Sequence, residues 1–197
     1  MTDQILKRGD WWVIGQSDLC STTIPYRFEE RQDGNINHGF IDLRESPELA
    51  ETIPEAKKSD GLLKLIKTVA QTNSPLMTSA CECTIFDTGR KDYPYSANGF
   101  VFVCFKSEIE NANKQNLLNL AGNIIEHLEF TEVIEVNYEF TVEPLLNFFG
   151  FKNCFVLELK TIGYGLHAQY AWDNFAKGKM MLAKSIANLY SLPFESQ

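Results

Sequence analysis

Apolar and polar residues alternate along two parts of the chain, and each part is followed by a long segment with helical periodicity. Alternation with a period of two indicates half-buried strands, whereas apolar residues three and four positions apart indicate helices. Residues 100–105 are apolar at every position, which predicts a central strand covered on both faces. The predicted strands are residues 80–87, 100–105, 134–140 and 155–160, and the predicted helices are residues 108–129 and 167–189. The order strand, strand, helix is therefore predicted twice, over residues 80–129 and 132–191.

The two predicted long helices end with similar apolar positions. The matching pairs are Leu120 and Leu182, Ala121 and Ala183, Ile124 and Ile186, Leu128 and Leu189, and Phe130 and Phe194. Helices with matching apolar faces can pack on one shared core. We therefore interpret the second and third parts of the chain as a structural repeat.

The first 72 residues have a less regular pattern and are a candidate for a degenerate third copy. The predicted elements are strands at residues 11–14, 24–30 and 39–43, a turn at Asp33-Gly34, and a loop or short broken helix at 46–56. Ser59 and Asp60 are favoured helix-capping residues, so a helix is predicted to begin there and to end before Asn73.

These elements predict an α+β fold, with a mostly antiparallel sheet and about three helices packed mainly on one face. A chain of 197 residues can bury about 70% of its unfolded surface, so a single core is sufficient. No stretch of the sequence resembles a linker. We therefore predict one domain over residues 1–197.

Composition and charge exclude several classes of protein. The net charge of −8 argues against nucleic-acid binding, which requires clustered Lys and Arg. The N-terminal ten residues lack the apolar stretch of a secretory signal, and no run of about 18 apolar residues predicts a membrane span. Five Cys in such a chain are typical of reduced thiols. We expect a cytoplasmic protein.

The acidic residues are unevenly distributed. No Lys or Arg lies between Lys114 and Lys152, whereas six Glu do: Glu126, Glu129, Glu132, Glu135, Glu139 and Glu143. A negative surface attracts basic partners. We therefore predict a partner-binding surface, which also includes charged and aromatic residues of the loop after residue 87. The predicted partner-binding residues are Glu132, Glu135, Glu139, Glu143, Arg90, Tyr93 and Tyr95.

Three thiols are predicted to lie on one sheet, at Cys81, Cys83 and Cys104. Zinc ligands could come from such a group, but structural zinc sites place Cys two to four residues apart on turns. Buried Cys commonly packs as a small apolar side chain. We expect core packing, with no metal and no cofactor.

A weaker candidate for ligand binding precedes the last helix. Gly163 and Gly165 would let the backbone approach an anion beside His167, but the segment lacks the remaining residues of a phosphate-binding loop. A tight strand-to-helix turn is the simpler explanation of the glycines. Trp11 and Trp12 are predicted to point to opposite faces of a strand, which would leave one ring available for a ligand or partner.

Two functions remain open from the sequence. The leading hypothesis is a non-enzymatic interaction protein whose acidic face binds a basic protein, because no convergent catalytic set is present. The alternative is a small-molecule binder or enzyme with a cleft between the two repeated units, lined by Gly163, Gly165, His167 and Trp12. Self-association through an exposed sheet edge in the first part of the chain is a third hypothesis.

Overall fold

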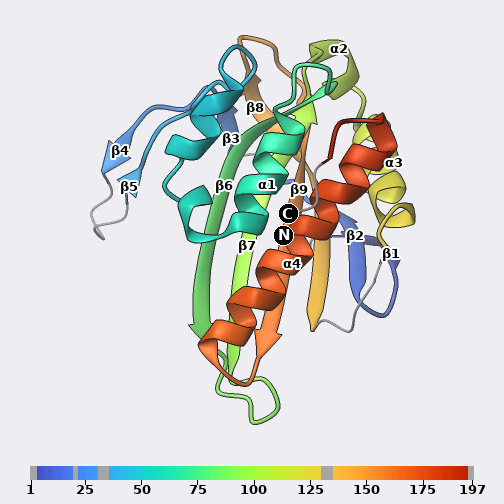
Figure 1. The fold of residues 1–197 in the computed structure, drawn as a ribbon. Coiled ribbons are helices and arrows are strands. Elements are labelled where there is room, and N and C mark those ends of the chain that lie inside the picture. Colours follow the sequence, from blue (N-terminus) through green and yellow to red (C-terminus); the bar gives the residue numbers. More distant parts are fainter. Residues whose placement is uncertain (1–3, 20–21, 31–35, 130–134, 195–197) are drawn as a thin grey trace.

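The computed structural model describes residues 4–19, 22–30, 36–129 and 135–194. Seven strands form one sheet, in the order β1-β2-β8-β9-β7-β6, with β3 also paired to β8. The strands of this sheet are β1 (Gln4–Arg8), β2 (Trp12–Gln16), β3 (Thr22–Ile24), β6 (Leu76–Asp87), β7 (Tyr95–Phe105), β8 (Val136–Phe148) and β9 (Cys154–Gly165). A separate pair, β4 (Glu29–Glu30) and β5 (Ile36–Asn37), lies beside β6 (Figure 1).

The helices cover one face of the large sheet (Figure 1). The helical elements are η1 (Pro47–Thr52), η2 (Ala56–Lys58), α1 (Asp60–Val69), α2 (Glu108–Asn111), α3 (Lys114–Glu126) and α4 (Ala168–Tyr190). The apolar sides of α1, α3 and α4 belong to the same core cluster as the strand residues that face them. The predicted α+β fold, with helices packed on a mostly antiparallel sheet, is confirmed.

The register of the sheet explains the main core. Cys81, Val101, Leu159, Phe140 and Ile14 are aligned in one row across β6, β7, β9, β8 and β2. All of these side chains face the helices, because residues that pair across a sheet point to the same face. Burial of such a row against three helices accounts for the apolar alternation that the sequence shows.

The predicted helix at 108–129 is two helices. Asn111 is buried, and its side chain accepts from the Phe105 N–H and donates to the Phe105 carbonyl, both at 2.8 Å. The helix then ends, and the Asn113 side chain caps α3 by accepting from the Gln115 N–H at 3.0 Å. Asn competes for backbone groups in this way, which explains the break.

Both long segments have the order strand, strand, helix. β6, β7 and α3 follow one another in the second part of the chain, and β8, β9 and α4 follow in the third. However, α3 has 13 residues and α4 has 23. A repeat in the sense of two equivalent units stays a prediction.

The first part of the chain differs from its prediction. β2 and β3 both pair with β8 in parallel, whereas β1 and β2 form an antiparallel pair at the edge of the sheet and β4 and β5 form a separate pair. A third equivalent copy of the unit stays a prediction. The strand predicted at residues 39–43 is wrong: β5 ends at Asn37, and Gly39 has a φ of +84°. The strand predicted at 24–30 is divided between β3 and β4. The predicted turn at Asp33-Gly34 lies outside the described residues.

A second, smaller core lies on the opposite face of the sheet, at one end. Its buried members are Ile24, Met77, Cys104, Leu145, Phe148, Cys154 and Val156. The loop after β3 covers it with Phe40, while Phe149 packs beside Phe40 with ring centroids 5.7 Å apart. This face of the sheet is therefore covered only at that end. No helix in the described part of the chain has the length and apolar character needed to cross a membrane.

Candidate functional site

The helix-free face of the sheet contains most of the residues that could meet a partner. We call it the open face. Its residues are Glu82, Asn98, Phe100, Phe102, Glu139, Thr141, Glu143, Glu158, Lys160, Ile162 and Tyr164. They alternate with the core residues of β6 to β9, so they point away from the helices.

Two aromatic rings lie at the centre of the open face. The centroids of Phe100 and Phe102 are 4.9 Å apart, and the ring planes are inclined by 31°. Phe102 is aligned with Glu158 on the neighbouring strand, and Phe100 is aligned with Lys160. The aromatic pair is half-buried, so part of its surface is available for contact.

Carboxylates outnumber ammonium groups beside these rings. β8 and β9 contain Glu139, Glu143 and Glu158 but one basic residue, Lys160. Lys160 binds Glu139 with 2.5 Å between Nζ and Oε2. Burial, and to a smaller extent the nearby Glu143 carboxylate, raise the pKa of Glu158 to about 7. The open face is acidic, and one of its carboxyl groups is poised to lose its proton when a cation approaches.

The loop between β6 and β7 meets the open face. The Tyr93 hydroxyl donates to Glu135 Oε2 at 3.0 Å, and this bond raises the pKa of Tyr93. The Tyr93 ring lies 5.5 Å from the Tyr164 ring, and the Arg90 guanidinium is 6.0 Å from the Tyr93 centroid. Two groups of predicted residues, one from the loop and one from the Glu-rich segment, therefore meet in space.

The other predicted partner-binding residues have different positions. Glu139 and Glu143 lie on the open face, as described above. Tyr95 is half-buried and packs against the main core, on the helix side of β7. Glu132 lies outside the described residues.

A groove of about 940 Å³ runs beside β6. Seven consecutive residues, Thr78 to Thr84, line it on one side. The other lining residues come from β7 and from the segment 22–66: Thr22, Thr23, Tyr26, Ile36, Asn37, His38, Gly39, Ile41, Ile53, Pro54, Glu55, Lys58, Ile66, Phe100 and Phe102. We call this the β6 groove. Phe100 and Phe102 belong to both the groove and the open face.

Comparisons with protein-family models, with curated proteins and with solved structures give no match to this chain. No relative therefore indicates a function. The open face and the β6 groove are the surfaces of the protein that could bind a partner or a ligand.

The thiols in the β6 groove are poorly suited to nucleophilic chemistry. Burial raises the pKa of Cys81 to about 12, with a smaller contribution from Glu55. Burial also raises the pKa of Cys83, whose Sγ donates to the Glu55 carbonyl at 3.5 Å. Nucleophilic attack requires the thiolate, which these environments disfavour.

The third predicted thiol lies elsewhere. Cys104 is in the second core, with Cys154, on the opposite face of the sheet from Cys81 and Cys83. The described residues contain no group of three His, Cys, Asp or Glu side chains that could hold a metal ion. The buried positions of Cys83 and Cys104 agree with packing as small apolar side chains.

The glycines near the start of α4 allow close packing. A Cβ on Gly163 would lie 2.3 Å from the Phe175 backbone nitrogen, and one on Gly165 would lie 2.5 Å from the Ala171 nitrogen. Both glycines are in β9, and α4 packs directly over them. His167 is exposed and stacks on Tyr170 with 5.9 Å between the ring centroids.

The two tryptophans do not divide between core and solvent as predicted. Both rings are half-buried and pack against the main core. Trp11 lies edge-on to Tyr138, with ring centroids 5.9 Å apart, and Trp12 packs over Gly9. The predicted ligand-binding residues Gly163, Gly165, His167 and Trp12 do not line the β6 groove.

The sequence analysis missed a buried lysine. Lys179 is fully buried, and its Nζ donates to the Leu159 carbonyl at 2.8 Å. Burial lowers its pKa to about 7. The spacing in the sequence could have indicated this burial. Lys179 is four residues after Phe175 and three before Leu182, which places it on the apolar side of the helix.

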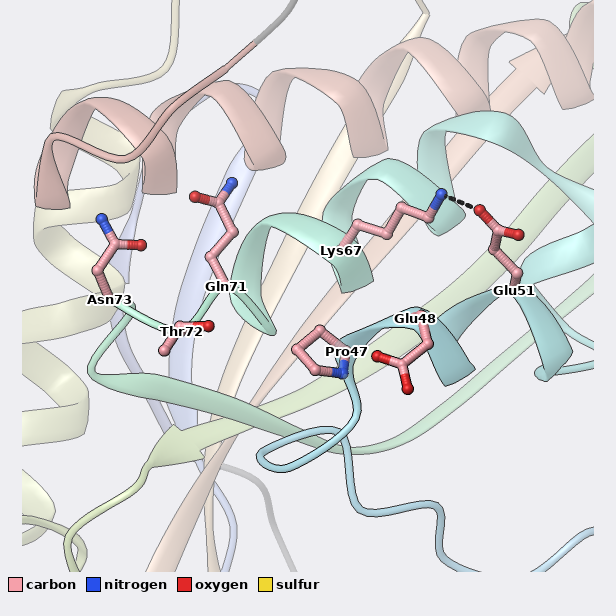
Figure 2. A pocket seen from close by; sticks show the side chains of 7 residues that line it. All are labelled: Pro47, Glu48, Glu51, Lys67, Gln71, Thr72 and Asn73. Carbon is pink, nitrogen blue, oxygen red and sulfur yellow. Dashed lines mark hydrogen bonds and ion pairs between the residues drawn. The ribbon is translucent and has the colours of Figure 1, made fainter.

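A second hollow, of about 460 Å³, lies between η1 and the end of α1 (Figure 2). Lys67 and Glu51 form an ion pair of 2.5 Å across it, and both side chains are exposed. Gln71 donates to the Pro193 carbonyl at 2.9 Å, which ties this region to the C-terminal segment. These residues satisfy one another, and we assign the hollow no function.

Proposed function

We propose that this protein is a non-enzymatic interaction protein whose open face binds a basic partner protein. The observation that carries the proposal is the arrangement of charge: Glu139, Glu143 and Glu158 lie on the β8–β9 side of a half-buried aromatic pair, with Lys160 as the basic residue among them. Aromatic centres with charged surroundings are typical of protein interfaces.

The electrostatic environment supports a cationic partner. Glu158 is half-buried, and its ionised form is disfavoured by burial and by Glu143. A Lys or Arg of the partner would favour the ionised form, so binding would release a proton near pH 7. The overall net charge of −8 would add long-range attraction to a basic protein.

The proposal is tested with matched charge variants. A triple variant, Glu139→Gln, Glu143→Gln and Glu158→Gln, removes three carboxylates from the open face. The control triple, Glu48→Gln, Glu110→Gln and Glu126→Gln, removes three exposed carboxylates from η1, α2 and α3. A partner is first captured with the wild-type protein from host extract and purified, and association rates are then measured at low salt.

We expect the open-face triple to lower the association rate constant about tenfold or more, because steering depends on local charge. The control should retain most of the wild-type rate. Equal rates for both triples, or a captured partner with an acidic binding surface, would contradict the proposal.

Small-molecule binding is the second candidate function. The observation that favours it is the volume of the β6 groove, about 940 Å³, which is within the range of ligand pockets. Melting curves with phosphorylated metabolites and divalent cations would test it. Stabilisation by one class of ligand would favour this function over the first.

A further inference from the structure

β6 is an edge strand of the large sheet. It has twelve residues, and β7 pairs with one of its edges along the whole length. In the part of the chain that the structure describes, no strand pairs with its other edge. Backbone N–H and C=O groups on an unpaired edge can bind a further strand.

The β6 groove lies along this unpaired edge. Successive residues of a strand point to opposite faces, so a cavity over one face would be lined by every second residue. Here the lining includes every residue from Thr78 to Thr84, from both faces of the strand. Only a cavity beside the backbone edge can contact all of them.

The opposite wall of the groove includes a short strand. Ile36 and Asn37, which form β5, line the groove together with His38. β5 pairs with β4, and this pair lies beyond the outer side of β6, with the segment that contains η1 and η2 between them in the view of Figure 1. β5 is therefore one part of the wall that faces β6 across the groove.

A buried polar atom also faces this groove without a partner. Ser79 is only 3% exposed, and its Oγ has no hydrogen-bond partner among the described residues. Ser79 lies at a β-bulge, since the register shifts between Thr78 and Ala80. Buried hydroxyl groups are normally satisfied, so the unpartnered Ser79 Oγ marks an unusual position on the edge strand.

We propose that the β6 groove binds an extended segment of a partner polypeptide, which adds to β6 as a new edge strand. Seven residues of strand span about 20 Å, and their backbone groups recur with a period of two. Another polypeptide backbone repeats its donors and acceptors with the same period, which makes it the complementary ligand.

The lining residues also indicate the side chains of the segment. Toward the helices, Ile53, Ile66 and the Cys81 and Cys83 thiols offer apolar surface, beside the opposite charges of Glu55 and Lys58. Toward the open face, the groove is lined by Glu82 beside Phe100 and Phe102. A segment that alternates apolar and basic side chains would match both sides.

No undescribed stretch of the given sequence is long enough to fill the groove. Each stretch outside the described residues has at most five residues, which is shorter than the seven-residue lining strand. Pairing of two copies through their β6 edges is also unsuitable, because described residues between Thr22 and Lys58 wall this edge in each copy. Two such edges could not meet without displacement of both walls.

This inference rests on the proposed function in that the partner is a protein, but its surface is centred on the outer edge of β6 and shares Glu82, Phe100 and Phe102 with the open face. If the open-face triple loses partner binding and a groove variant binds normally, the proposed function is supported and the inference about the groove is wrong. If a groove variant loses partner binding and the open-face triple binds normally, the groove is the binding site and the acidic open face has no role in binding.

The test begins with a random ten-residue peptide library displayed on phage and selected against the full chain. A selected peptide is then measured by fluorescence anisotropy against two variants. Ala80→Arg places a long side chain in the groove, whereas Phe86→Arg places the same side chain on the same face of β6, outside the groove and at an exposed position.

We expect Ala80→Arg to weaken binding at least tenfold and Phe86→Arg to leave it within twofold. A peptide with N-methyl groups at alternate positions should not bind, because it lacks the backbone donors that a new strand requires. Hydrogen exchange at β6 amides should slow when the unmodified peptide is bound.

Several results would overturn the inference. These are failure of the library to yield a peptide that depends on the groove, equal binding of the N-methylated peptide, and protection of amides elsewhere than β6. Sedimentation that shows a dimer with β6 already protected would assign the edge to a second copy. Displacement of the peptide by a stabilising metabolite would assign the groove to a small molecule. Circular dichroism and melting curves confirm that both variants are folded before these comparisons are made.

Discussion

Lys179 is the side chain whose environment differs most from its ordinary one. It lies between α4 and β9 without contact with solvent, and its Nζ is 2.8 Å from the Leu159 carbonyl and 5.5 Å from the Phe175 ring centroid. Neither neighbour is a full counter-charge. The protonated amine is therefore poorly stabilised, and burial lowers the pKa to about 7.

This shift predicts a pH-dependent stability. The pKa of Lys179 is about 7 in the folded protein and about 10.4 in an unfolded chain. Between these values the unfolded chain binds more protons, so stability should rise with pH, by up to about 1.4 kcal/mol per pH unit. Lys179→Met should remove this slope. Urea unfolding at pH 7, 8 and 9 measures it.

The matched control is Lys177→Met, at an exposed position two residues earlier on α4. It should keep the wild-type slope between pH 7 and 9. If Lys179→Met and Lys177→Met have the same slope as the wild-type protein, the buried amine does not titrate in this range.

Glu158 has the opposite dependence on pH. Its pKa is raised to about 7, mainly by burial, whereas an unfolded Glu titrates near 4.3. The folded protein then binds more protons between these values, so stability is present below about pH 4 and is lost as pH rises to 7. Glu158→Gln should raise the free energy of unfolding at pH 8 by up to about 3 kcal/mol relative to its effect at pH 4.

Melting temperatures at pH 4.5 and 8 would measure the effect of Glu158→Gln. Glu110→Gln, at an exposed position on α2, is the control and should change little at either pH. A Glu158→Gln variant with the same pH dependence as the wild-type protein would show that Glu158 titrates normally.

At the scale of elements, the contact between α4 and β9 depends on the absence of side chains. Gly163 and Gly165 allow the helix backbone to approach the strand, with Phe175 and Ala171 directly above them. Tyr138 adds a polar contact nearby, since its hydroxyl donates to the Gly178 carbonyl at 3.1 Å. The helix is held at one distance from the sheet by these close contacts.

Gly163→Ala should therefore destabilise the protein. The added Cβ would be 2.3 Å from the Phe175 nitrogen, and overpacking of this kind costs about 1–3 kcal/mol or more. Gly122→Ala is the control, because a Cβ at Gly122 in α3 has nothing within 4 Å. It should stabilise by about 0.5–1 kcal/mol, the difference in helix propensity. Denaturant unfolding of both variants distinguishes these outcomes; equal stabilities would refute the close contact.

At the scale of the whole molecule, the two faces of the sheet are covered differently. α1, α3 and α4 pack on one face, and their apolar side chains form the main core together with the strand residues that face them. On the other face, the segment after β3 covers one end and then continues around the outer side of β6. The open face and the β6 groove are therefore neighbours, and Phe100 and Phe102 belong to both.

The edges of the sheet are also different from each other. β1 forms one edge, and all five of its residues are exposed. β6 forms the other edge, where Thr78 and Ser79 are buried behind the segment 22–58. Self-association through the edge in the first part of the chain stays a prediction, for which β1 is the available strand.

Much of the candidate site was present in the sequence as separate pieces. The Glu-rich segment and the loop with Tyr93 were both predicted to bind a partner, but nothing in the sequence indicated that Tyr93 and Glu135 would meet. The groove was not predicted, because its two walls are residues 78–84 and a segment that begins more than fifty residues earlier.

Local patterns determined the elements of the second and third parts of the chain. Alternation predicted β6 to β9, helical spacing predicted α1 and α4, and Ser59 predicted the start of α1, where its Oγ accepts from the Leu62 N–H at 3.3 Å. These patterns succeed because each such element exposes one side and buries the other, and burial selects apolar residues at a fixed period.

Only the tertiary structure decided how the first part of the chain is used. β2 and β3 pair with β8, which follows more than 110 residues later, so their conformation depends on contacts that no local pattern records. The same long-range packing buries Lys179, leaves one face of the sheet open and leaves the outer edge of β6 without a strand. The features that carry function in this protein come from that arrangement, since they arise where distant segments meet or fail to cover one another.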